Sequence, residues 1–211
     1  IAPASMTKVM TVYVIADQIS NSPMISLDDE VLISKKAWAK NVEGSKTYIE
    51  AGKRVSVKDL LSGIIIQSGN DASIAMAEYI ASSEEGFVDL MNQYVLKMGL
   101  TNTLFVDSTG LSNNNFSSAK DLAQLTQALI NDFPDYYEEF NVKSFTFNNI
   151  KSFNTNKLLW RDDSVDGVKS GCTKAAGYCL ISSAKKNDMR LIAVITGSSS
   201  KNQRLNSSQS L

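Results

Sequence analysis

The sequence contains no histidine. A chain without histidine cannot build a Ser-His-Asp triad, a Cys-His pair or a histidine metal cluster. Its 2 cysteines are too few for a zinc site of four thiolates. If a serine of this chain is a nucleophile, its base must therefore be another side chain. Lysine is the obvious candidate, because burial or a neighbouring cation can lower its pKa towards neutrality.

An excess of charge of one sign and long apolar runs are also missing. The 21 basic and 22 acidic residues nearly cancel, so the chain has no electrostatic footprint for nucleic acid or an anionic membrane. No apolar stretch reaches the roughly 18 residues of a membrane span, and no charged and apolar leader opens the sequence. We expect either a cytosolic protein or one whose signal has been removed. A composition of 43% hydrophobic residues is typical of a globular protein and excludes a disordered chain.

The stretch PASMTKVMT, residues 3–11, places a lysine three residues after a serine where an apolar run begins. Apolar residues at helical spacing from Met6 to Ile19 predict a largely buried helix. The spacing puts Ser5 and Lys8 on one face of its first turn, where the lysine could act as a base against the hydroxyl. Ser5 could equally be an N-cap that accepts a backbone N–H.

A Ser-x-x-Lys pattern alone proves little, since it recurs four more times, starting at Ser117, Ser182, Ser183 and Ser198. The match at Ser5 differs from the other four because two further motifs follow it in the sequence. Ser68-Gly69-Asn70 and Lys169-Ser170-Gly171 follow in the order and approximate spacing of a known three-part catalytic constellation. Ser-x-Asn also occurs elsewhere, but Lys-Ser/Thr-Gly occurs only once.

With these motifs the chain resembles the penicillin-recognising serine enzymes, and most closely the low-molecular-weight penicillin-binding proteins that are D-alanyl-D-alanine carboxypeptidases. The resemblance rests on the opening stretch and on three longer phrases. These are LLSGIIIQSGNDASIAMAEYI at 60–80, FVDSTGL at 105–111 and VDGVKSGCTKAAGYCLISSA at 165–184. The similarity covers nearly the whole chain. It implies a peptidoglycan stem peptide ending in D-Ala-D-Ala as substrate, acylation by β-lactam antibiotics, no cofactor, and no nucleic-acid partner.

The resemblance also implies roles for the motif residues. Ser5 would attack the carbonyl of the penultimate D-alanine, and Lys8 would take the hydroxyl proton. Ser68 and Lys169 would complete the proton route to the leaving nitrogen. Asn70 would position Lys8 and the substrate amide. Two lysines close together would lower each other's pKa, which favours a neutral Lys8.

Substrate binding is expected along the third motif and near the C-terminus. By the same resemblance, the backbone N–H groups of Ser5 and Cys172 would form the oxyanion hole, and the hydroxyl of Ser170 would bind the substrate carboxylate. Arg204 matches a family arginine that holds that carboxylate, although it could also be a surface arginine opening a terminal helix. Thr155 stands where some relatives have a basic residue. The remaining expected substrate contacts are Gly171 and Thr173.

The predicted fold is α/β, of the β-lactamase and transpeptidase-like type, with helices packed on an antiparallel sheet. Strand-like segments at 165–172, 178–184 and 190–195 are joined by connections short enough for hairpins. Helices are expected at 57–67, 71–81, 84–98 and 119–131. We interpret residues 1–211 as a single catalytic domain, with a helical lobe at about 21–140 and a sheet lobe formed by about 1–20 and 141–211.

Two departures from the family pattern concern the chain ends and the cysteines. Only four residues precede Ser5, where relatives have a few dozen, so we interpret the chain as a fragment. Any membrane anchor would lie outside it, and the expected location is periplasmic or otherwise extracytoplasmic. Cys172 and Cys179 flank a short turn and could form a disulfide, but the strict geometry of disulfides favours free thiols.

Two alternatives to the carboxypeptidase remain. The first is a β-lactamase of the same superfamily, which in class A would need a Glu-x-x-x-Asn deacylation element after the Ser-x-Asn motif. Only Glu138-Glu139-Phe140-Asn141 comes near this element, and its spacing is wrong. The second is a non-catalytic wall-binding relative, against which stands the presence of all three motifs.

Overall fold

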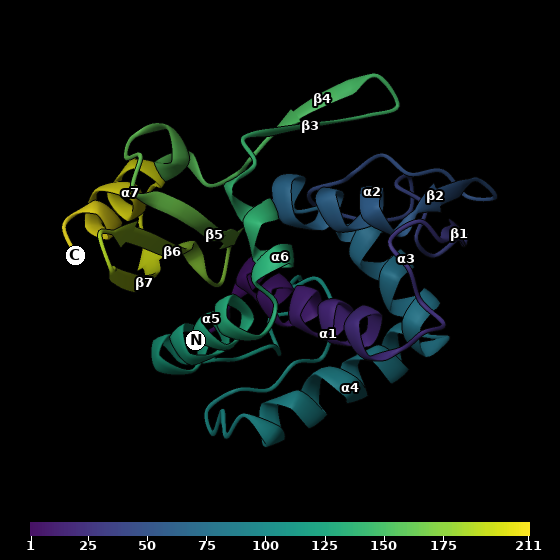
Figure 1. The fold of residues 1–211 in the computed structure, drawn as a ribbon, viewed down its shortest axis with the longest axis horizontal. Helices are drawn as coiled ribbons and strands as arrows, with labels where there is room; N and C mark the ends of the chain where they lie inside the picture. The colour runs from purple at the N-terminus through teal and green to yellow at the C-terminus, as the bar shows by residue number, and fades with distance from the viewer.

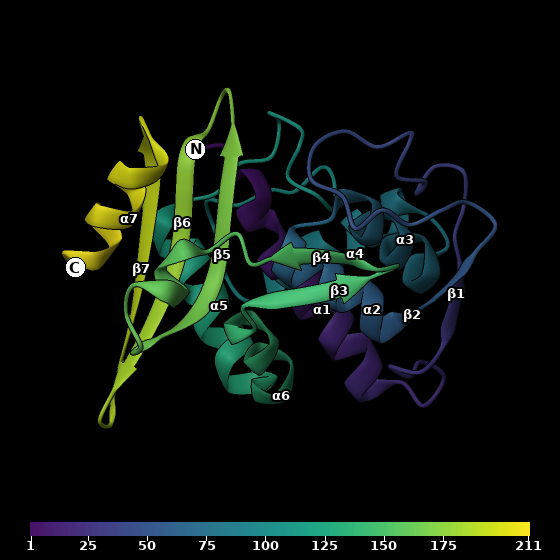
Figure 2. The same cartoon turned by 90° about the horizontal axis from the view of Figure 1, so that it is seen from above.

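The computed structural model describes residues 1–211 and places a three-stranded antiparallel sheet beside a group of helices (Figure 1). The sheet has the order β5 (Val165–Thr173), β6 (Gly177–Lys186) and β7 (Met189–Ser198). Helix α7 (Lys201–Gln209) packs on one face of the sheet, and α5 (Ala119–Asp132) lies on the other side, as Figure 2 shows. The predicted α/β class, with helices on an antiparallel sheet, is confirmed.

Each strand of the sheet is somewhat longer than its alternating pattern predicts. The register pairs Lys169 of β5 with Ile181 of β6, and Ile181 with Val194 of β7. Six of the nine residues of β5 are buried, because β6 and the short turns η1, η3 and η4 pack against it. The third motif therefore lies on the most enclosed strand of the sheet.

The helical part is built around one central helix. A 3₁₀ turn, η1 (Ala4–Thr7), leads into α1 (Lys8–Asn21), in which every residue from Lys8 to Ala16 is buried. A helix that is buried on all sides needs apolar residues all round, and this is the composition that the sequence shows. Helix α1 packs against α3 (Asn70–Ala81), α4 (Glu84–Lys97) and α5. The helix that the sequence groups with the sheet lobe thus packs among helices.

The segment expected as one helix at 57–67 has two parts. Helix α2 (Val57–Ser62) begins at Ser56, whose side chain accepts a hydrogen bond from the N–H of Asp59. A wider π-type turn, η2 (Gly63–Gln67), follows and ends directly before Ser68. Such π-turns occur frequently at functional sites.

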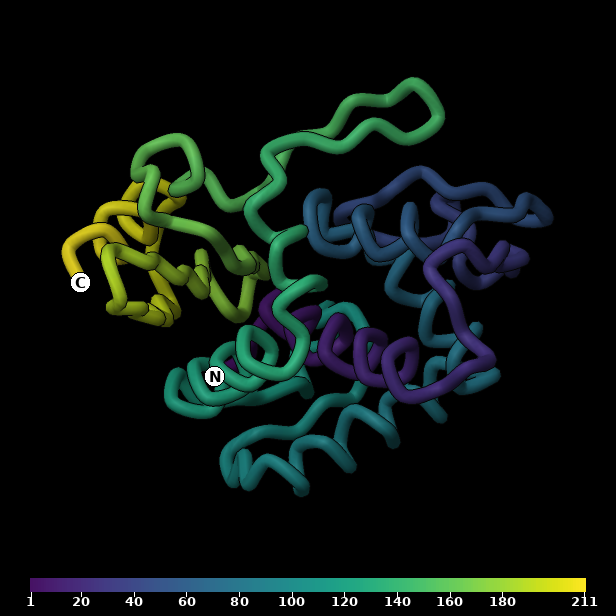
Figure 3. The backbone as a smooth tube through the Cα atoms, in the orientation of Figure 1, coloured from purple at the N-terminus to yellow at the C-terminus, as the bar shows by residue number.

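Short elements complete the structure. Two small antiparallel sheets are formed by β1 (Glu30–Leu32) with β2 (Arg54–Ser56), and by the hairpin of β3 (Ser144–Phe147) with β4 (Ile150–Phe153). This hairpin extends from the junction between sheet and helices towards α2, as the tube in Figure 3 shows. The remaining short elements are α6 (Pro134–Tyr137), η3 (Glu138–Asn141) and η4 (Lys157–Trp160). None of the helices combines the length and the apolar character that crossing a membrane requires.

Candidate active site

The first turn of the chain brings the predicted nucleophile and base together. Ser5 lies in η1, Lys8 is the first residue of α1, and Ser5 Oγ is 3.3 Å from Lys8 Nζ. Neither helix start shows a side-chain cap, and the residues at the cap positions are Pro3 and Thr7. The alternative of Ser5 as an N-cap is therefore wrong. Its hydroxyl is half-buried and directed at a lysine.

Lys8 is fully buried, and its hydrogen bonds direct its reactive electron pair. Nζ lies 2.6 Å from Asn70 Oδ1 and 2.7 Å from the carbonyl oxygen of Thr109, and both atoms can only accept. A neutral amine has two N–H bonds and one lone pair. Because these acceptors take both N–H bonds, the lone pair points to the third neighbour, Ser5 Oγ. Lys8 is thus arranged to receive the hydroxyl proton.

The environment of Lys8 favours this neutral form near physiological pH. Burial lowers the pKa of Lys8 from its ordinary value to about 7, and the carboxylates of Asp107 and Asp71 oppose the shift. A base is most effective when its pKa is close to the working pH. Burial and carboxylates together therefore set a pKa that suits general-base chemistry.

The acceptor Asn70 is fixed by the loop that covers the second motif. Its amide nitrogen donates to the carbonyl oxygen of Glu43 at 2.8 Å, which assigns Oδ1 to Lys8. Its backbone N–H donates to the carbonyl oxygen of Ser45 at 2.8 Å. The next residue, Asp71, is buried and accepts the backbone N–H groups of Thr47, Tyr48 and Ile49. This carboxylate holds the covering loop in place.

The second acceptor is a backbone carbonyl in the FVDSTGL segment. Asp107 accepts hydrogen bonds from the backbone N–H groups of Thr109 at 2.8 Å and Ser112 at 2.7 Å, which folds the loop around one carboxylate. Gly110 has φ +84°, and a Cβ there would lie 1.9 Å from the carbonyl oxygen of Ala4. The role of Thr109 cannot be predicted from its residue type, because any residue can supply a backbone carbonyl as an acceptor.

Ser68 sits in a left-handed backbone conformation with φ +64°. This conformation is uncommon for a residue with a Cβ and is enriched at functional sites. The Ser68 hydroxyl is buried and has no hydrogen-bond partner within the protein, and Ser68 lines the same cleft as Ser5. An unpaired buried hydroxyl is costly, so this one is available to a proton donor or acceptor on a bound substrate.

Lys169 lies in the middle of β5 and is buried, with 1% of its surface exposed. Its partners are distant, with Thr155 Oγ1 at 3.4 Å and the carbonyl oxygen of Ser170 at 3.3 Å from Nζ. Burial, followed by the positive charges of Lys8 and Arg204, holds the pKa of Lys169 well below its ordinary value. The charge of Lys8 thus lowers the pKa of Lys169, whereas the lowered pKa of Lys8 itself comes from burial.

The third motif passes against the backbone of the nucleophile. A Cβ on Gly171 would lie 3.0 Å from the backbone nitrogen of Ser5, which shows how closely β5 approaches η1. Cys172 follows as an exposed residue at the cleft. Cys179 is buried, and both thiols are free, as the sequence analysis favours. Thr173 lies apart from this cleft, in a neighbouring hollow at the turn between β5 and β6.

Arg204 is buried, with 6% of its surface exposed, so the alternative of a surface arginine is wrong. It donates hydrogen bonds to the carbonyl oxygens of Gly171 at 3.2 Å and Cys179 at 3.1 Å. Its Nε has no partner within the protein. The guanidinium is thus anchored to the sheet and retains an unused donor. Burial lowers the pKa of Arg204 from its ordinary value.

A cleft of about 320 Å³ joins these groups. Ser5, Ser68, Ser170 and Arg204 line it, whereas Lys8, Asn70 and Lys169 are buried behind its wall. No aspartate or glutamate lines the cleft. Lining residues that the sequence analysis did not propose for the site are Ser45, Phe153, Lys157, Tyr178, Lys201 and Leu205. The cleft is therefore cationic and rich in hydroxyl groups, which suits an anionic peptide end.

Comparison with known proteins gives consistent matches along the chain. Residues 1–200 match the family described as D-alanyl-D-alanine carboxypeptidase. The chain is 47% identical over 215 aligned residues to D-alanyl-D-alanine carboxypeptidase DacC of Escherichia coli K12. This alignment covers 99% of this chain and 54% of that protein. The chain spans about half the length of the curated relatives it matches.

Solved structures show the same relation. Penicillin binding protein 5 from Haemophilus influenzae superposes with a TM-score of 0.96 at 42% identity, covering 100% of this chain and 62% of that one. Penicillin-binding protein D2 from Listeria monocytogenes, in its ampicillin-bound form, gives a TM-score of 0.83 at 27% identity, covering 98% and 84%. The predicted transpeptidase-like fold is thereby confirmed.

Proposed function

Given that this chain belongs to the D-alanyl-D-alanine carboxypeptidase family, we propose that it carries the catalytic domain of a serine enzyme that removes the terminal D-alanine from peptidoglycan stem peptides. One observation carries the proposal. Ser5 Oγ lies 3.3 Å from an amine whose two other partners, Asn70 Oδ1 and the Thr109 carbonyl oxygen, leave only its lone pair for the hydroxyl.

In the first half of the reaction, Ser5 Oγ bonds to the carbonyl carbon of the penultimate D-alanine while Lys8 takes its proton. The carbonyl oxygen becomes negative, and the backbone N–H groups of Ser5 and Cys172 stabilise it. The C–N bond then breaks, and the proton returns from Lys8 through Ser68 to the leaving nitrogen. The unpaired Ser68 hydroxyl in the cleft supports this route. The products are an acyl-enzyme at Ser5 and free D-alanine.

In the second half, water replaces D-alanine at the acyl carbon. Lys8 accepts a proton from the water, hydroxide adds to the ester carbonyl, and the bond to Ser5 Oγ breaks with return of the proton to that oxygen. Asn70 holds Lys8 in place through both halves. Lys169 would complete the proton route beside Ser68, and its pKa, held well below its ordinary value, favours the neutral amine.

Substrate recognition follows from the wall of the cleft. We propose that the terminal carboxylate binds the Ser170 hydroxyl and the guanidinium of Arg204, since both residues line the cleft and charge-assisted hydrogen bonds are the strongest available here. The extended peptide end would lie along β5 beside Gly171 and Thr173. With Thr155 offering only a hydroxyl, affinity for the carboxylate depends mainly on Arg204.

The same chemistry implies acylation by β-lactams, whose strained amide presents an equivalent carbonyl to Ser5. We further propose that residues 1–211 form one catalytic domain working outside the cytoplasm, where its peptidoglycan substrate lies. In that setting the enzyme would take part in cell wall biogenesis and in setting cell shape.

Labelling with a fluorescent penicillin, followed by mapping of the modified peptide, tests the proposal in the full-length protein. We expect modification of Ser5 alone and none in Ser5→Ala. Label at Ser117, Ser182, Ser183 or Ser198 would refute the assignment. None of these serines has a lysine Nζ among its hydrogen-bond partners.

The lifetime of the penicillin adduct at Ser5 distinguishes a carboxypeptidase from the alternative, a β-lactamase. An opened β-lactam stays tethered at Ser5 and obstructs the approach of water, and no carboxylate lines the cleft to activate one. Glu139, which the sequence places near a deacylation element, instead accepts a hydrogen bond from Ser62 at 2.6 Å. We expect many turnovers of a D-alanyl-D-alanine peptide beside a long-lived penicillin adduct. Rapid hydrolysis of penicillin with an untouched peptide would reverse the assignment.

A further inference from the structure

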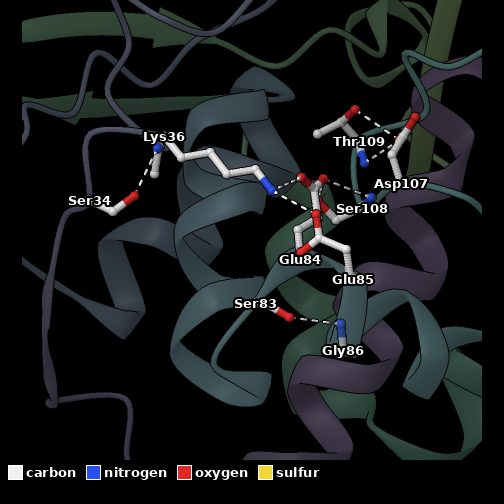
Figure 4. Close-up of polar contacts among 10 residues, drawn as sticks. Ser34, Lys36, Ser83, Glu84, Glu85, Gly86, Asp107, Ser108 and Thr109 are labelled. Carbon is white, nitrogen blue, oxygen red and sulfur yellow. Dashed lines mark hydrogen bonds and ion pairs between the residues drawn. The ribbon is translucent and has the colours of Figure 1, made fainter.

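Glu84 is a largely buried carboxylate outside the cleft that joins two loops (Figure 4). It is the first residue of α4, and 14% of its side chain is exposed. Its Oε1 accepts hydrogen bonds from the Ser108 backbone N–H at 3.2 Å and from the Ser108 hydroxyl at 2.8 Å. Its Oε2 pairs with Lys36 Nζ at 3.2 Å. None of the three motifs includes these residues.

On one side, this contact fixes the loop that holds the base. Ser108 lies directly before Thr109, whose carbonyl oxygen is 2.7 Å from Lys8 Nζ. The carbonyl oxygen of Ser108 itself accepts a hydrogen bond from Thr11 Oγ1 on α1 at 2.7 Å. Ser108 is therefore tied both to α4 and to α1. The Thr109 carbonyl has little freedom to leave Lys8 while both ties persist.

On the other side, Lys36 belongs to the segment that continues into the loop covering Asn70. That loop supplies the carbonyl oxygen of Glu43, which orients the Asn70 amide at 2.8 Å. The bridge from Lys36 through Glu84 to Ser108 thus joins the loop that orients the Asn70 amide to the loop whose Thr109 carbonyl accepts an N–H bond of Lys8. Nothing else in the catalytic chemistry accounts for a carboxylate at this position.

We propose that Glu84 is a positioning residue for the general base, holding the Ser108-Thr109 loop against the loop that covers Asn70 so that Lys8 keeps both acceptors. The inference rests on the proposed function, because it concerns the base of that reaction. Loss of the carboxylate frees the Ser108 N–H and hydroxyl, lets the Thr109 carbonyl turn away, and admits water to Lys8.

The pH dependence of acylation separates positioning from simple stabilisation. The charged groups that shape the pKa of Lys8 are the carboxylates of Asp71 and Asp107, and Lys169 is coupled to it from β5. Burial is the main cause of the lowered pKa of Lys8. Because admitted water relieves that burial, the pKa rises and the neutral base is reached only at higher pH.

The experiment measures the rate of acylation by a chromogenic penicillin against pH in Glu84→Ala, Glu84→Gln and Glu85→Ala. We expect Glu84→Ala to acylate about tenfold more slowly, because small misplacements of a catalytic group are costly, with its pH profile displaced upward. Glu84→Gln keeps an acceptor for Ser108 and should retain most of the rate with the parent profile. Glu85→Ala is the matched control, since Glu85 also pairs with Lys36 but is 79% exposed and does not touch Ser108.

An unchanged rate and profile in Glu84→Ala would overturn the inference. A slower rate with the parent pH profile and a lowered unfolding temperature would also overturn it, because Glu84 would then be only structural. A parent protein that is not acylated at all would instead refute the proposed function, and this inference with it.

Discussion

Two lysines of this chain are buried to the same degree, yet their surroundings differ. Lys8 has short hydrogen bonds to two fixed acceptors, and the carboxylates of Asp71 and Asp107 lie close enough to raise its pKa. Lys169 has only distant partners at 3.3 and 3.4 Å and two cations nearby. The pKa of Lys8 is about 7, and the pKa of Lys169 lies well below its ordinary value.

The difference teaches that burial alone does not make a general base. Burial removes the stabilisation of an ammonium by water, and it does so at both positions. Carboxylates restore part of that stabilisation only at Lys8, which brings its pKa into the range where proton uptake and release are both possible. At Lys169 no carboxylate opposes burial, and the positive charges of Lys8 and Arg204 lower its pKa further.

The strongest test of this comparison removes each lysine in turn. Lys8→Ala should slow acylation by penicillin by about a hundredfold to ten-thousandfold, the range for a lost general base. Lys169→Ala should cost less, because the lone pair of Lys8 stays on Ser5. Lys120→Ala on the exposed first turn of α5 is the control and should be close to the parent. Equal acylation rates in Lys8→Ala and the parent would contradict the base role.

A smaller effect is expected when the cation nearest the expected carboxylate is removed. Arg204→Gln should reduce turnover of peptides with a free C-terminal carboxylate by about tenfold or more, since a hydrogen bond to a charged group is worth about 1.5–3 kcal/mol. Steady-state kinetics on the amidated peptide provide the internal control. If turnover of both peptides falls equally, Arg204 serves only to join Gly171 and Cys179.

The smallest change should make Lys8 resemble Lys169 more closely. Asp107→Asn removes a carboxylate that raises the pKa of Lys8, so that pKa falls. Acylation needs the neutral amine, and its rate rises with pH through this pKa. The acid limb should therefore move to lower pH by on the order of half a unit. A limb that moves upward, or stays, would show that Asp107 acts through the loop alone.

Much of the fold can be predicted, because the spacing of apolar residues and the residues that form turns and helix caps are clear in most segments. The three strands alternate and are separated by short turns, and Ser118 caps α5 as the polar start of that helix suggests. The segment at 57–67 was harder, since a π-turn has the same apolar spacing as a helix over five residues. The short helix α6 is not among the predicted helices, because proline usually ends a helix although it is also a favoured first residue, as Pro134 is here.

At the candidate site, residue types that act through side chains were predictable and backbone groups were not. Ser5 and Lys8 are three residues apart, so their contact follows from one turn of helix. The contacts of Lys8 with Asn70 and Thr109 span 62 and 101 residues, and only the folded chain brings them together. The burial of Arg204 and the bridge through Glu84 depend on such distant packing as well.

The turn shared by Ser5 and Lys8 has a consequence for the newly made chain. The two residues are neighbours in the unfolded chain as well, but an unfolded lysine has a pKa of about 10.4 and is protonated at neutral pH. The serine beside it is then as inert as any other alcohol. Reactivity begins only when the loops of Asn70 and Thr109 close over the amine and expel water. Penicillin would therefore label only correctly folded molecules, and misfolded molecules would remain unlabelled.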